Sequence, residues 1–359
     1  MKNIVNKNVL KIKPYEPGKP IEEVERELGL KNVIKLASNE NPLGSSLRAL
    51  SAIKKKLGTL NRYPDGNCFY LKNKLAKKLG LKPQNLIFGN GSDELIDVVI
   101  KTFVGPDEEV LTSKVSFVEY EIVSRSNNRK FRDIPLKNFK YDLRAIKMAI
   151  GKNTKAIFIA NPNNPTGTYV NKKELEDFLR GLPKNIIVVL DEAYNEFVDV
   201  KDFPKGLNYI NKNVILLRTF SKTYGLAGLR IGYAIARPEF IECMNRVRQP
   251  FNVNLLAQAA ALEAIDDIAF LGRTRKITLD GKKYLYRELD RLGFPYVSSV
   301  ANFILIDLKQ DCRIVFNKLL KEGVIVRPMG TYNLKNFIRV TIGTKKENTR
   351  FINSLRRIL

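Results

Sequence analysis

Short apolar segments alternate with amphipathic stretches along most of the chain. Compact apolar runs bounded by polar or turn residues lie at 85–90, 109–113, 155–162, 185–193 and 213–221. Strands that are buried on both faces, as in a parallel sheet covered by helices, have this pattern. Stretches with helical periodicity alternate with these runs, and two of them, which end at Gly58 and Gly80, precede the first run. The alternation predicts an α/β fold with a mostly parallel sheet from about residue 45 to residue 260.

A different pattern begins at about residue 265. A long charged helix is predicted over 262–292, where Gly293 ends it, and short apolar segments and two further helices follow. This order is typical of a smaller α+β domain. Residues 1–35 have the pattern of an arm followed by one short helix that ends at Gly29. We therefore expect three parts: an N-terminal arm with a small-domain segment (1–37), a large domain (38–262) and a small C-terminal domain (263–359).

The composition is that of an ordinary globular enzyme. Of the 359 residues 44% are hydrophobic and 28% are charged, and no apolar stretch approaches the length that spans a bilayer. The basic N-terminus lacks the apolar core of a signal peptide, so we expect a cytoplasmic protein without membrane contact. The cysteines Cys68, Cys243 and Cys312 are far apart and form no CxxC pair. We interpret them as free thiols and expect neither a disulfide framework nor a zinc site.

The chain contains no histidine. This excludes Ser-His-Asp and Cys-His catalysis and every metal site that histidine would ligate. Proton transfer near neutral pH must then use another group with a shifted pKa, and a desolvated or Schiff-base lysine is the usual substitute. The net charge of +25 fits compositional drift toward Lys, Asn and Ile, or steering of an anionic substrate. Since the basic residues are scattered among acids, we expect no nucleic-acid partner.

Polar stretches follow several of the apolar runs, at the strand ends where open α/β sheets bind ligands. GNGSDEL (89–95) combines glycines with the start of a helix, which suits a phosphate group but also occurs in simple loops. ANPNNPTG (160–167) presents Asn163 and Asn164 on a turn, and a plain turn is the alternative. Each of these two stretches is ambiguous when it is considered alone.

Two further strand ends carry ionisable residues. Asp191 follows four apolar residues, and a buried carboxylate there needs a positive partner, such as a protonated pyridine nitrogen, unless it caps a helix. In TFSKTYGLAGLRIGY (219–233), Ser221 and Lys222 follow the last run and Arg230 lies beyond a glycine-bearing loop. A single lysine in so basic a chain has no meaning by itself. Its place among the other three stretches is what distinguishes Lys222.

Together these stretches resemble those of the fold-type-I aminotransferases, which depend on pyridoxal 5′-phosphate (PLP). More narrowly, the chain resembles the class-II-like histidinol-phosphate aminotransferases along its whole length. The similar stretches, in the order of that family, are PYEPGKP (14–20), SNENPLG (38–44), RYPD (62–65), GNGSDELI (89–96), NPNNPTG (161–167), DEAY (191–194), TFSKTYGLAGLRIGY (219–233), ANFIL (301–305), VRPMG (326–330) and IRVTIG (338–343). Threonine-phosphate decarboxylases and some aromatic aminotransferases share most of them. The resemblance therefore implies the fold and PLP more specifically than it implies the substrate.

The resemblance also implies catalytic roles for individual residues. Lys222 would carry PLP as a Schiff base and then move the proton of the substrate Cα. Asp191 would pair with the pyridinium nitrogen and keep the ring an electron sink. Asn164 and Tyr194 would form hydrogen bonds with the ring hydroxylate.

Further residues would hold the cofactor by the same resemblance. Those expected at its phosphate are Ser92, Asp93, Ser221 and Arg230. Phe117, in KVSFVEY, falls where the family stacks an aromatic ring on the cofactor, and a role in the core is the alternative. Tyr63 would reach the cofactor phosphate of a neighbouring subunit, which implies a homodimer with shared active sites.

The substrate end is expected around an arginine. Arg339 lies where the family binds the substrate carboxylate, and a planar guanidinium suits carboxylate or phosphate because it donates two parallel hydrogen bonds. Tyr15, Asn302 and Arg327 are further candidates for this end. A structural salt bridge is the alternative for Arg327.

The implied function is transfer of an amino group from L-histidinol phosphate to 2-oxoglutarate, which yields imidazole acetol phosphate and L-glutamate in histidine biosynthesis. Small anionic molecules would be the partners, and no metal is expected. The alternatives are an aromatic amino acid aminotransferase and a PLP lyase of the threonine-phosphate decarboxylase type. A non-catalytic regulator with this fold is disfavoured, because every catalytic position is filled.

Overall fold

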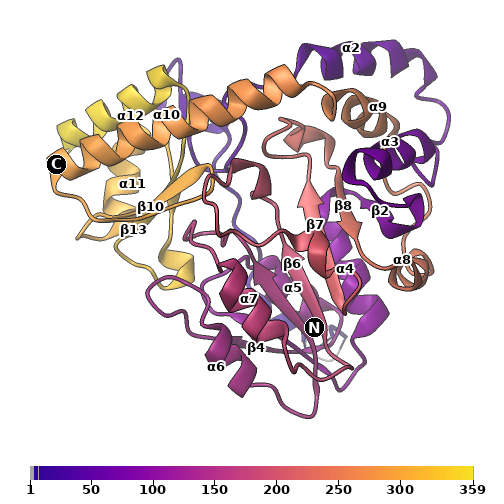
Figure 1. The fold of residues 1–359 in the computed structure, drawn as a ribbon. Coiled ribbons are helices and arrows are strands. Elements are labelled where there is room, and N and C mark those ends of the chain that lie inside the picture. Colours follow the sequence, from indigo (N-terminus) through magenta and orange to yellow (C-terminus); the bar gives the residue numbers. More distant parts are fainter. Residues whose placement is uncertain (1–3, 7, 359) are drawn as a thin grey trace.

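A seven-stranded sheet forms the centre of the protein in the computed structural model, which describes residues 4–6 and 8–358 (Figure 1). Its strand order is β2-β8-β7-β6-β5-β3-β4. The strands are β2 (Leu86–Gly89), β3 (Glu109–Ser113), β4 (Lys130–Ile134), β5 (Thr154–Ala160), β6 (Ile187–Asp191), β7 (Val214–Thr219) and β8 (Gly232–Ile235). Only β8 runs against the others, since it is antiparallel to both β2 and β7. The expected α/β fold with a mostly parallel sheet is confirmed.

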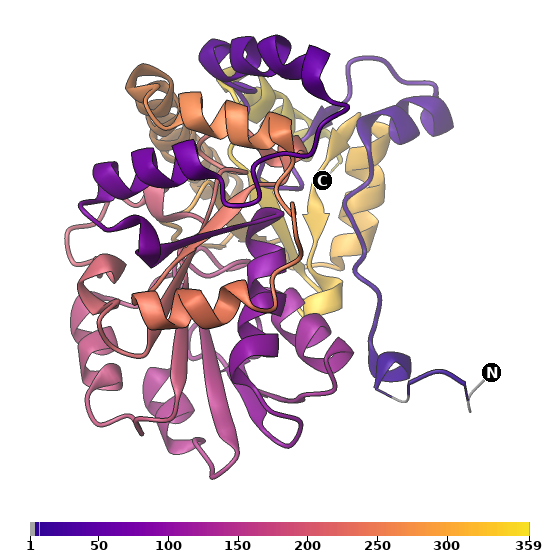
Figure 2. The same cartoon turned by 90° about the vertical axis from the view of Figure 1, so that its right-hand side faces the viewer.

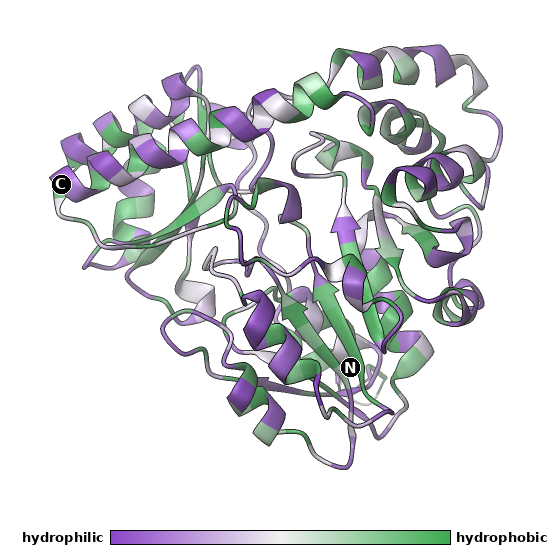
Figure 3. Ribbon diagram, viewed as in Figure 1, coloured by the Kyte–Doolittle hydropathy of each residue, from purple (hydrophilic) through white to green (hydrophobic). Residues whose placement is uncertain are grey.

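The strands in the middle of this sheet are buried along their whole length. Every residue of β6 and β7 is buried, and these apolar strands stand out in the hydropathy view (Figure 3). Helix α4 packs against β2, β7 and β8. The helices of this part of the chain are α2 (Leu47–Lys56), α3 (Phe69–Leu79), α4 (Gly91–Phe103), α5 (Glu119–Ser126), α6 (Leu143–Met148), α7 (Lys172–Leu179) and α8 (Pro238–Asn245). Burial on both sides explains why the central runs are continuously apolar.

The long helix expected over 262–292 is two helices in the structure. Helix α9 (Leu255–Ala264) ends before α10 (Ile268–Leu292) begins, so the predicted start is wrong. Asp267 begins α10, because its side chain accepts a hydrogen bond from the backbone N–H of Phe270 (3.0 Å). The predicted end is correct, since Gly293 adopts a left-handed conformation (φ 70°) that closes the helix.

The C-terminal region is built on a second sheet, with the order β12-β13-β10-β9 and antiparallel pairing. Its elements are β9 (Tyr296–Val297), β10 (Phe303–Asp307), α11 (Cys312–Lys321), β11 (Val324–Ile325), β12 (Arg327–Pro328), β13 (Phe337–Thr341) and α12 (Lys345–Ile358). This region has its own buried apolar cluster, separate from the one around the large sheet. Two clusters favour the expected division into 1–37, 38–262 and 263–359, which stays a prediction.

The N-terminal segment belongs structurally to the C-terminal region. It contains α1 (Ile21–Leu28) and the short strand β1 (Ile34–Lys35), which pairs in parallel with β11. The backbone oxygen of Leu36 also accepts a hydrogen bond from the N–H of Thr341 (2.8 Å). Figure 2 shows this extended segment running beside the C-terminal elements. None of the helices described is both long enough and apolar enough to cross a bilayer.

Candidate functional site

A cavity of about 360 Å³ opens at the carboxyl ends of β5, β6 and β7, beside the start of α4. Side chains from the N-terminal segment and from β13 complete its wall. The residues that the sequence analysis proposed and that line this cavity are Tyr15, Ser92, Asp93, Phe117, Asn164, Asp191, Tyr194, Ser221, Lys222, Arg230 and Arg339. Stretches that are distant in the sequence therefore meet at one edge of the sheet, as the position of ligand sites in such sheets predicts.

Lys222 lies just beyond β7, and its side chain reaches the cavity. Its Nζ donates a hydrogen bond to the backbone oxygen of Ser38 (3.1 Å). Burial, together with the positive charge of Arg339, lowers the pKa of Lys222 to about 8. A lysine with so low a pKa is partly neutral near pH 8, so its amine is available as a nucleophile or base.

Asp191 ends β6 and is buried, with 5% of its surface exposed. Its Oδ2 accepts a hydrogen bond from the Tyr120 hydroxyl (2.7 Å), and its Oδ1 accepts one from the N–H of Ala193 (3.1 Å). Burial raises its pKa to about 6. Within the described part of the chain, no lysine or arginine forms an ion pair with it. The site thus holds a buried carboxylate that a cationic ligand group would stabilise.

The start of α4 and Arg230 form the end of the cavity that suits a phosphate. Arg230 donates to Asp93 Oδ2 (2.7 Å) and, over a longer distance, to Ser221 Oγ (3.5 Å). Gly91 has a positive φ of 81°, and a Cβ there would lie 2.5 Å from the Arg230 guanidinium. The positive φ therefore favours glycine at this position. The unpaired N–H groups of the first turn of α4, with one arginine beside them, are a suitable environment for an anion.

Asn164 and Arg339 are joined across the cavity. Arg339 donates through Nη1 to Asn164 Oδ1 and through Nη2 to the backbone oxygen of Ala37. Because its oxygen is occupied, Asn164 has its Nδ2 amide available for another acceptor. The Arg339 Nε is buried and has no hydrogen-bond partner in the described structure. Burial also lowers the pKa of this arginine.

Tyr194 lies at the same wall, and its hydroxyl accepts a hydrogen bond from Asn39 Nδ2 (2.9 Å). Burial raises the pKa of Tyr194 to about 12, although the nearby Arg339 opposes this shift. The hydroxyl is therefore protonated at neutral pH and has a proton to donate. Asn39 lies in the SNENPLG stretch, from which no role was predicted for it.

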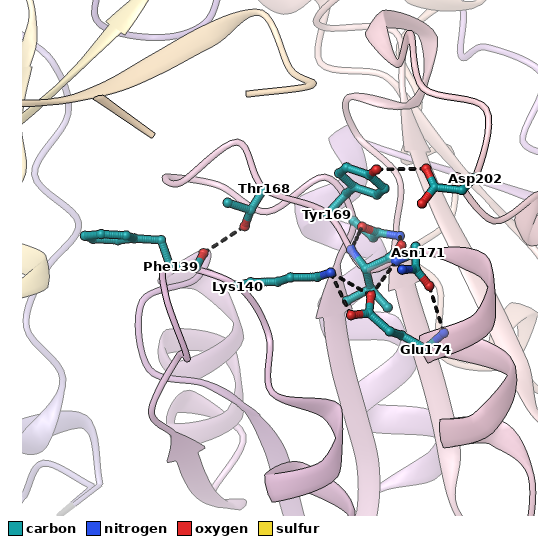
Figure 4. A network of polar contacts seen from close by, with 9 residues as sticks. Phe139, Lys140, Thr168, Tyr169, Asn171, Glu174 and Asp202 are labelled. Atoms are coloured by element: carbon teal, nitrogen blue, oxygen red, sulfur yellow. Dashed lines mark hydrogen bonds and ion pairs between the residues drawn. The ribbon is translucent and has the colours of Figure 1, made fainter. Parts of the chain in front are cut away.

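The loop after β5, which carries Asn164, is fixed by its own hydrogen bonds. Asn163 Nδ2 donates to Thr166 Oγ1 (2.9 Å), and the Thr166 and Thr168 hydroxyls are 2.8 Å apart. Thr168 in turn donates to the backbone oxygen of Phe139 (2.8 Å), as Figure 4 shows. The amide of Asn164 is thereby positioned by a rigid turn.

The far end of this loop is anchored where α7 begins. Asn171 and Glu174 form a capping box, in which each side chain accepts a hydrogen bond from the backbone N–H of the other residue. Lys140 bonds to the same Glu174 carboxylate (2.7 Å), and Tyr169 donates to Asp202 (2.8 Å), as Figure 4 shows. These contacts hold the loop at both ends.

Three of the proposed residues do not line the cavity. Asn302 is buried behind its wall, where Nδ2 donates to the backbone oxygen of Asn39 (3.1 Å). Arg327 packs its guanidinium over the Tyr15 ring, 5.5 Å from the ring centroid. Tyr63 is 83% exposed and stacks on Phe251 (4.7 Å between ring centroids). The roles expected for these residues stay predictions.

Several residues that line the cavity were not predicted from the sequence. Tyr120 follows Phe117 by three residues, and the two rings are in edge-to-face contact with centroids 5.7 Å apart. The spacing within KVSFVEY was a usable signal, since residues i and i+3 lie on one side of a helical turn. The other polar residues of this kind are Ser38, Asn39, Glu40, Glu119 and Thr219. No group of three or more metal-ligating side chains is found in the described residues.

Comparison with known proteins gives concordant results. The family model for aminotransferase class I and II matches residues 31–355. A histidinol-phosphate aminotransferase from Moorella thermoacetica is 50% identical over 354 residues, which cover 98% of this chain and 92% of the relative. Histidinol-phosphate aminotransferase 2 from Carboxydothermus hydrogenoformans is 48% identical over 99% of each chain. The crystal structure of histidinol-phosphate aminotransferase from Sinorhizobium meliloti in complex with pyridoxal-5′-phosphate superposes with a TM-score of 0.90, at 28% identity over 98% of this chain and 97% of that one.

Proposed function

Because the chain belongs to the family of class I and II aminotransferases, we propose that it uses PLP to transfer an amino group from L-histidinol phosphate to 2-oxoglutarate. The products are imidazole acetol phosphate and L-glutamate, and the reaction is a step of histidine biosynthesis. The observation that carries the proposal is that one cavity holds two ionisable groups with shifted pKa values. Lys222 is a lysine with a lowered pKa, and Asp191 is a buried carboxylate without a cationic partner in the described residues.

The residues of the cavity fit PLP on structural grounds. Asp191 has a raised pKa because it is buried, and a protonated pyridine nitrogen would supply the missing positive charge. The first turn of α4, with Arg230 and Ser221, suits the phosphate group. Asn164 Nδ2 and the Tyr194 hydroxyl can donate hydrogen bonds to a ring hydroxylate. Each polar group of the cofactor thus has a complementary partner.

PLP supplies an electron sink that stabilises negative charge at the substrate Cα. Lys222 Nζ would bind the cofactor covalently and, once displaced by the substrate amine, would carry the proton that leaves Cα. Asp191 would keep a proton on the pyridine nitrogen through its negative charge. Phe117, which lines the cavity next to Tyr120, would cover one face of the ring.

Both substrates bring an anion to the same end of the site. Glutamate carries an α-carboxylate, whereas histidinol phosphate carries a phosphate ester beyond its α-carbon. Arg339 is the buried cation of that end, and its Nε is without a partner in the described structure. We assign it to the carboxylate in one half-reaction and to the phosphate in the other, with Tyr15 and Arg327 assisting the larger anion.

The experiment that tests this function is a screen of amino donors with the purified protein. Histidinol phosphate, phenylalanine, tyrosine and threonine phosphate are each supplied with 2-oxoglutarate, and the formation of glutamate is measured. Histidinol phosphate is expected to give the highest kcat/KM. A preference for phenylalanine or tyrosine by orders of magnitude would identify an aromatic aminotransferase. Release of CO2 from threonine phosphate without glutamate formation would identify a lyase.

The homodimer is part of the same proposal and is supported by exposed apolar side chains. These lie on α2, on α3 and between them, with exposed fractions of 83% for Leu47, 57% for Leu60, 83% for Tyr63, 60% for Phe69 and 74% for Tyr70. Large exposed apolar patches mark interaction surfaces. A second copy of the chain is the occupant we propose, with Tyr63 reaching the partner's cavity. Light scattering that compares Leu47→Glu with the wild type tests the dimer. The cytoplasmic location stays a prediction.

A further inference from the structure

Glu119 differs from the other carboxylates that line the cavity. Asp93 bonds to Arg230, Asp191 accepts hydrogen bonds from Tyr120 and Ala193, and Glu40 forms an ion pair with Lys35 (2.9 Å). The Glu119 carboxylate forms no hydrogen bond and no ion pair with any residue that the structure describes. It is nevertheless half-buried in the wall of the cavity. A partly desolvated charge without a partner is unfavourable unless a ligand supplies a hydrogen-bond donor or an opposite charge.

Glu119 lies in the cavity wall next to the segment that carries Phe117. It is the first residue of α5, two residues after Phe117. Burial, together with the negative charge of Asp93, raises the pKa of Glu119. Glu119 is thus a carboxylate in the cavity wall, two residues from the ring expected to cover the cofactor, and none of the described arginines forms an ion pair with it.

A purely structural role is less satisfactory. An acidic residue in the first turn of a helix interacts favourably with the helix dipole. Glu121 occupies the same first turn of α5 and pairs with Arg125 on the next turn (2.7 Å). Glu121 does not line the cavity. Glu121 can therefore interact with the helix dipole without Glu119. Glu119, in contrast, is an acceptor in the cavity wall that no described residue uses.

We propose that Glu119 determines the specificity for the amino donor, by accepting a hydrogen bond from a ring N–H of its imidazole group. This inference rests on the proposed function. Histidinol phosphate has an amine, which is used at the cofactor, a phosphate, which needs cations, and an imidazole. The imidazole is the remaining polar group, and its N–H donor suits a carboxylate in either ring protonation state. Glutamate offers no such donor, so Glu119 acts in only one of the two half-reactions.

The proposal predicts how the site rejects aromatic competitors. A phenyl ring has the approximate size of imidazole but has no N–H, so it would leave the Glu119 carboxylate desolvated and unpaired. Sites built to bond a polar group of the substrate discriminate strongly against analogues that lack it. Selection for the imidazole ring would thus come from an acceptor rather than from pocket size.

The test compares two amino phosphates that differ only in the ring. These are L-histidinol phosphate and its phenyl analogue, 2-amino-3-phenylpropyl phosphate, each used to start the first half-reaction. The variants are Glu119→Leu and Glu119→Gln, with Glu121→Leu as the matched control that removes the other first-turn acid. Hydrogen bonds to charged groups contribute more to binding than neutral ones do. We therefore expect kcat/KM for histidinol phosphate to fall about 10- to 100-fold in Glu119→Leu. The loss should appear mainly in KM.

For the phenyl analogue, kcat/KM should change little in Glu119→Leu. For histidinol phosphate, the loss in Glu119→Gln should be intermediate, because the amide oxygen still accepts a hydrogen bond. Glu121→Leu should leave the ratio between the two donors at its wild-type value. Equal losses for both donors, or no loss for either, would overturn the assignment of Glu119. If the wild type uses neither amino phosphate and instead prefers phenylalanine, the proposed function itself fails. The wild-type preference and the variant ratio thus separate the two failures.

Discussion

The Asp191→Asn substitution removes a buried negative charge while it preserves the shape of the side chain. Burial raises the pKa of Asp191 from 3.8 to about 6, and a shift of two units corresponds to about 3 kcal/mol. Because the folded protein binds this proton more tightly than the unfolded chain does, the proton's contribution to stability is complete below pH 3.8. That contribution is lost as the pH rises to about 6.

Cofactor-free Asp191→Asn should therefore be more stable than the cofactor-free wild type. At pH 8 we expect a gain of up to about 3 kcal/mol in the free energy of unfolding, and about half of this at pH 5. Asparagine can keep both hydrogen bonds, since its oxygen accepts from Ala193 and its amide can donate to the Tyr120 hydroxyl. Turnover should nevertheless fall by at least about 100-fold, because a neutral amide does not hold a pyridinium proton.

Urea unfolding of both cofactor-free proteins at the two pH values measures the gain in stability. Single-turnover kinetics with PLP measure the loss of activity, and addition of PLP should stabilise the wild type more than the variant. A gain that is absent, or that is equal at pH 5 and pH 8, would contradict the argument from burial. A turnover near that of the wild type would contradict the role of Asp191 as the partner of the pyridine nitrogen.

Substitutions at three further residues of the site test their expected roles. Lys222→Ala should still bind PLP but lose nearly all turnover, and borohydride reduction of the wild type should label Lys222 alone in peptide mapping; a label elsewhere refutes the assignment. Tyr120→Phe removes a hydrogen bond that lowers the pKa of Asp191, so the acidic limb of the kcat/KM profile should move to higher pH; an unchanged limb would contradict this. Arg339→Ala should impair both half-reactions, measured separately by stopped flow, and Arg339→Lys should restore little because an ammonium lacks the planar fork. Intact binding of histidinol phosphate to Arg339→Ala would refute the shared anion site.

The central strands could be predicted from the sequence because they are buried on both faces and are therefore continuously apolar. The edge strand β4 could not, since it alternates exposed and partly buried residues and includes charged ones such as Arg132 and Asp133. The break between α9 and α10 was missed as well. It includes Asp266 and Asp267, which also fit an exposed helix surface, and the hydrogen bond that the Phe270 N–H donates to Asp267 shows where α10 begins.

The site could be predicted as far as its residues lie in local motifs at strand ends. Lys222 and Asp191 each follow an apolar run directly, so their place at the edge of the sheet followed from the order of strands. Asn39 and Tyr120 act through contacts with residues that are distant in the sequence, at Tyr194 and Asp191 respectively. Hydropathy along a chain contains no information about such pairings. Glu119 was missed because a first-turn acid in a helix has an ordinary structural explanation.

The pairing of β1 with β11 has a consequence for the order in which the protein becomes complete on the ribosome. Ile34 is synthesised early, but its partner Val324 follows only about 290 residues later. At ~5–20 residues per second, the N-terminal segment waits roughly 15–60 s for this strand. The seven-stranded sheet, whose last strand ends at Ile235, has all its strands well before then. The wall that Tyr15 and Arg339 contribute to the cavity is thus completed last, so a nascent chain contains Lys222 and Asp191 before the cavity around them is closed.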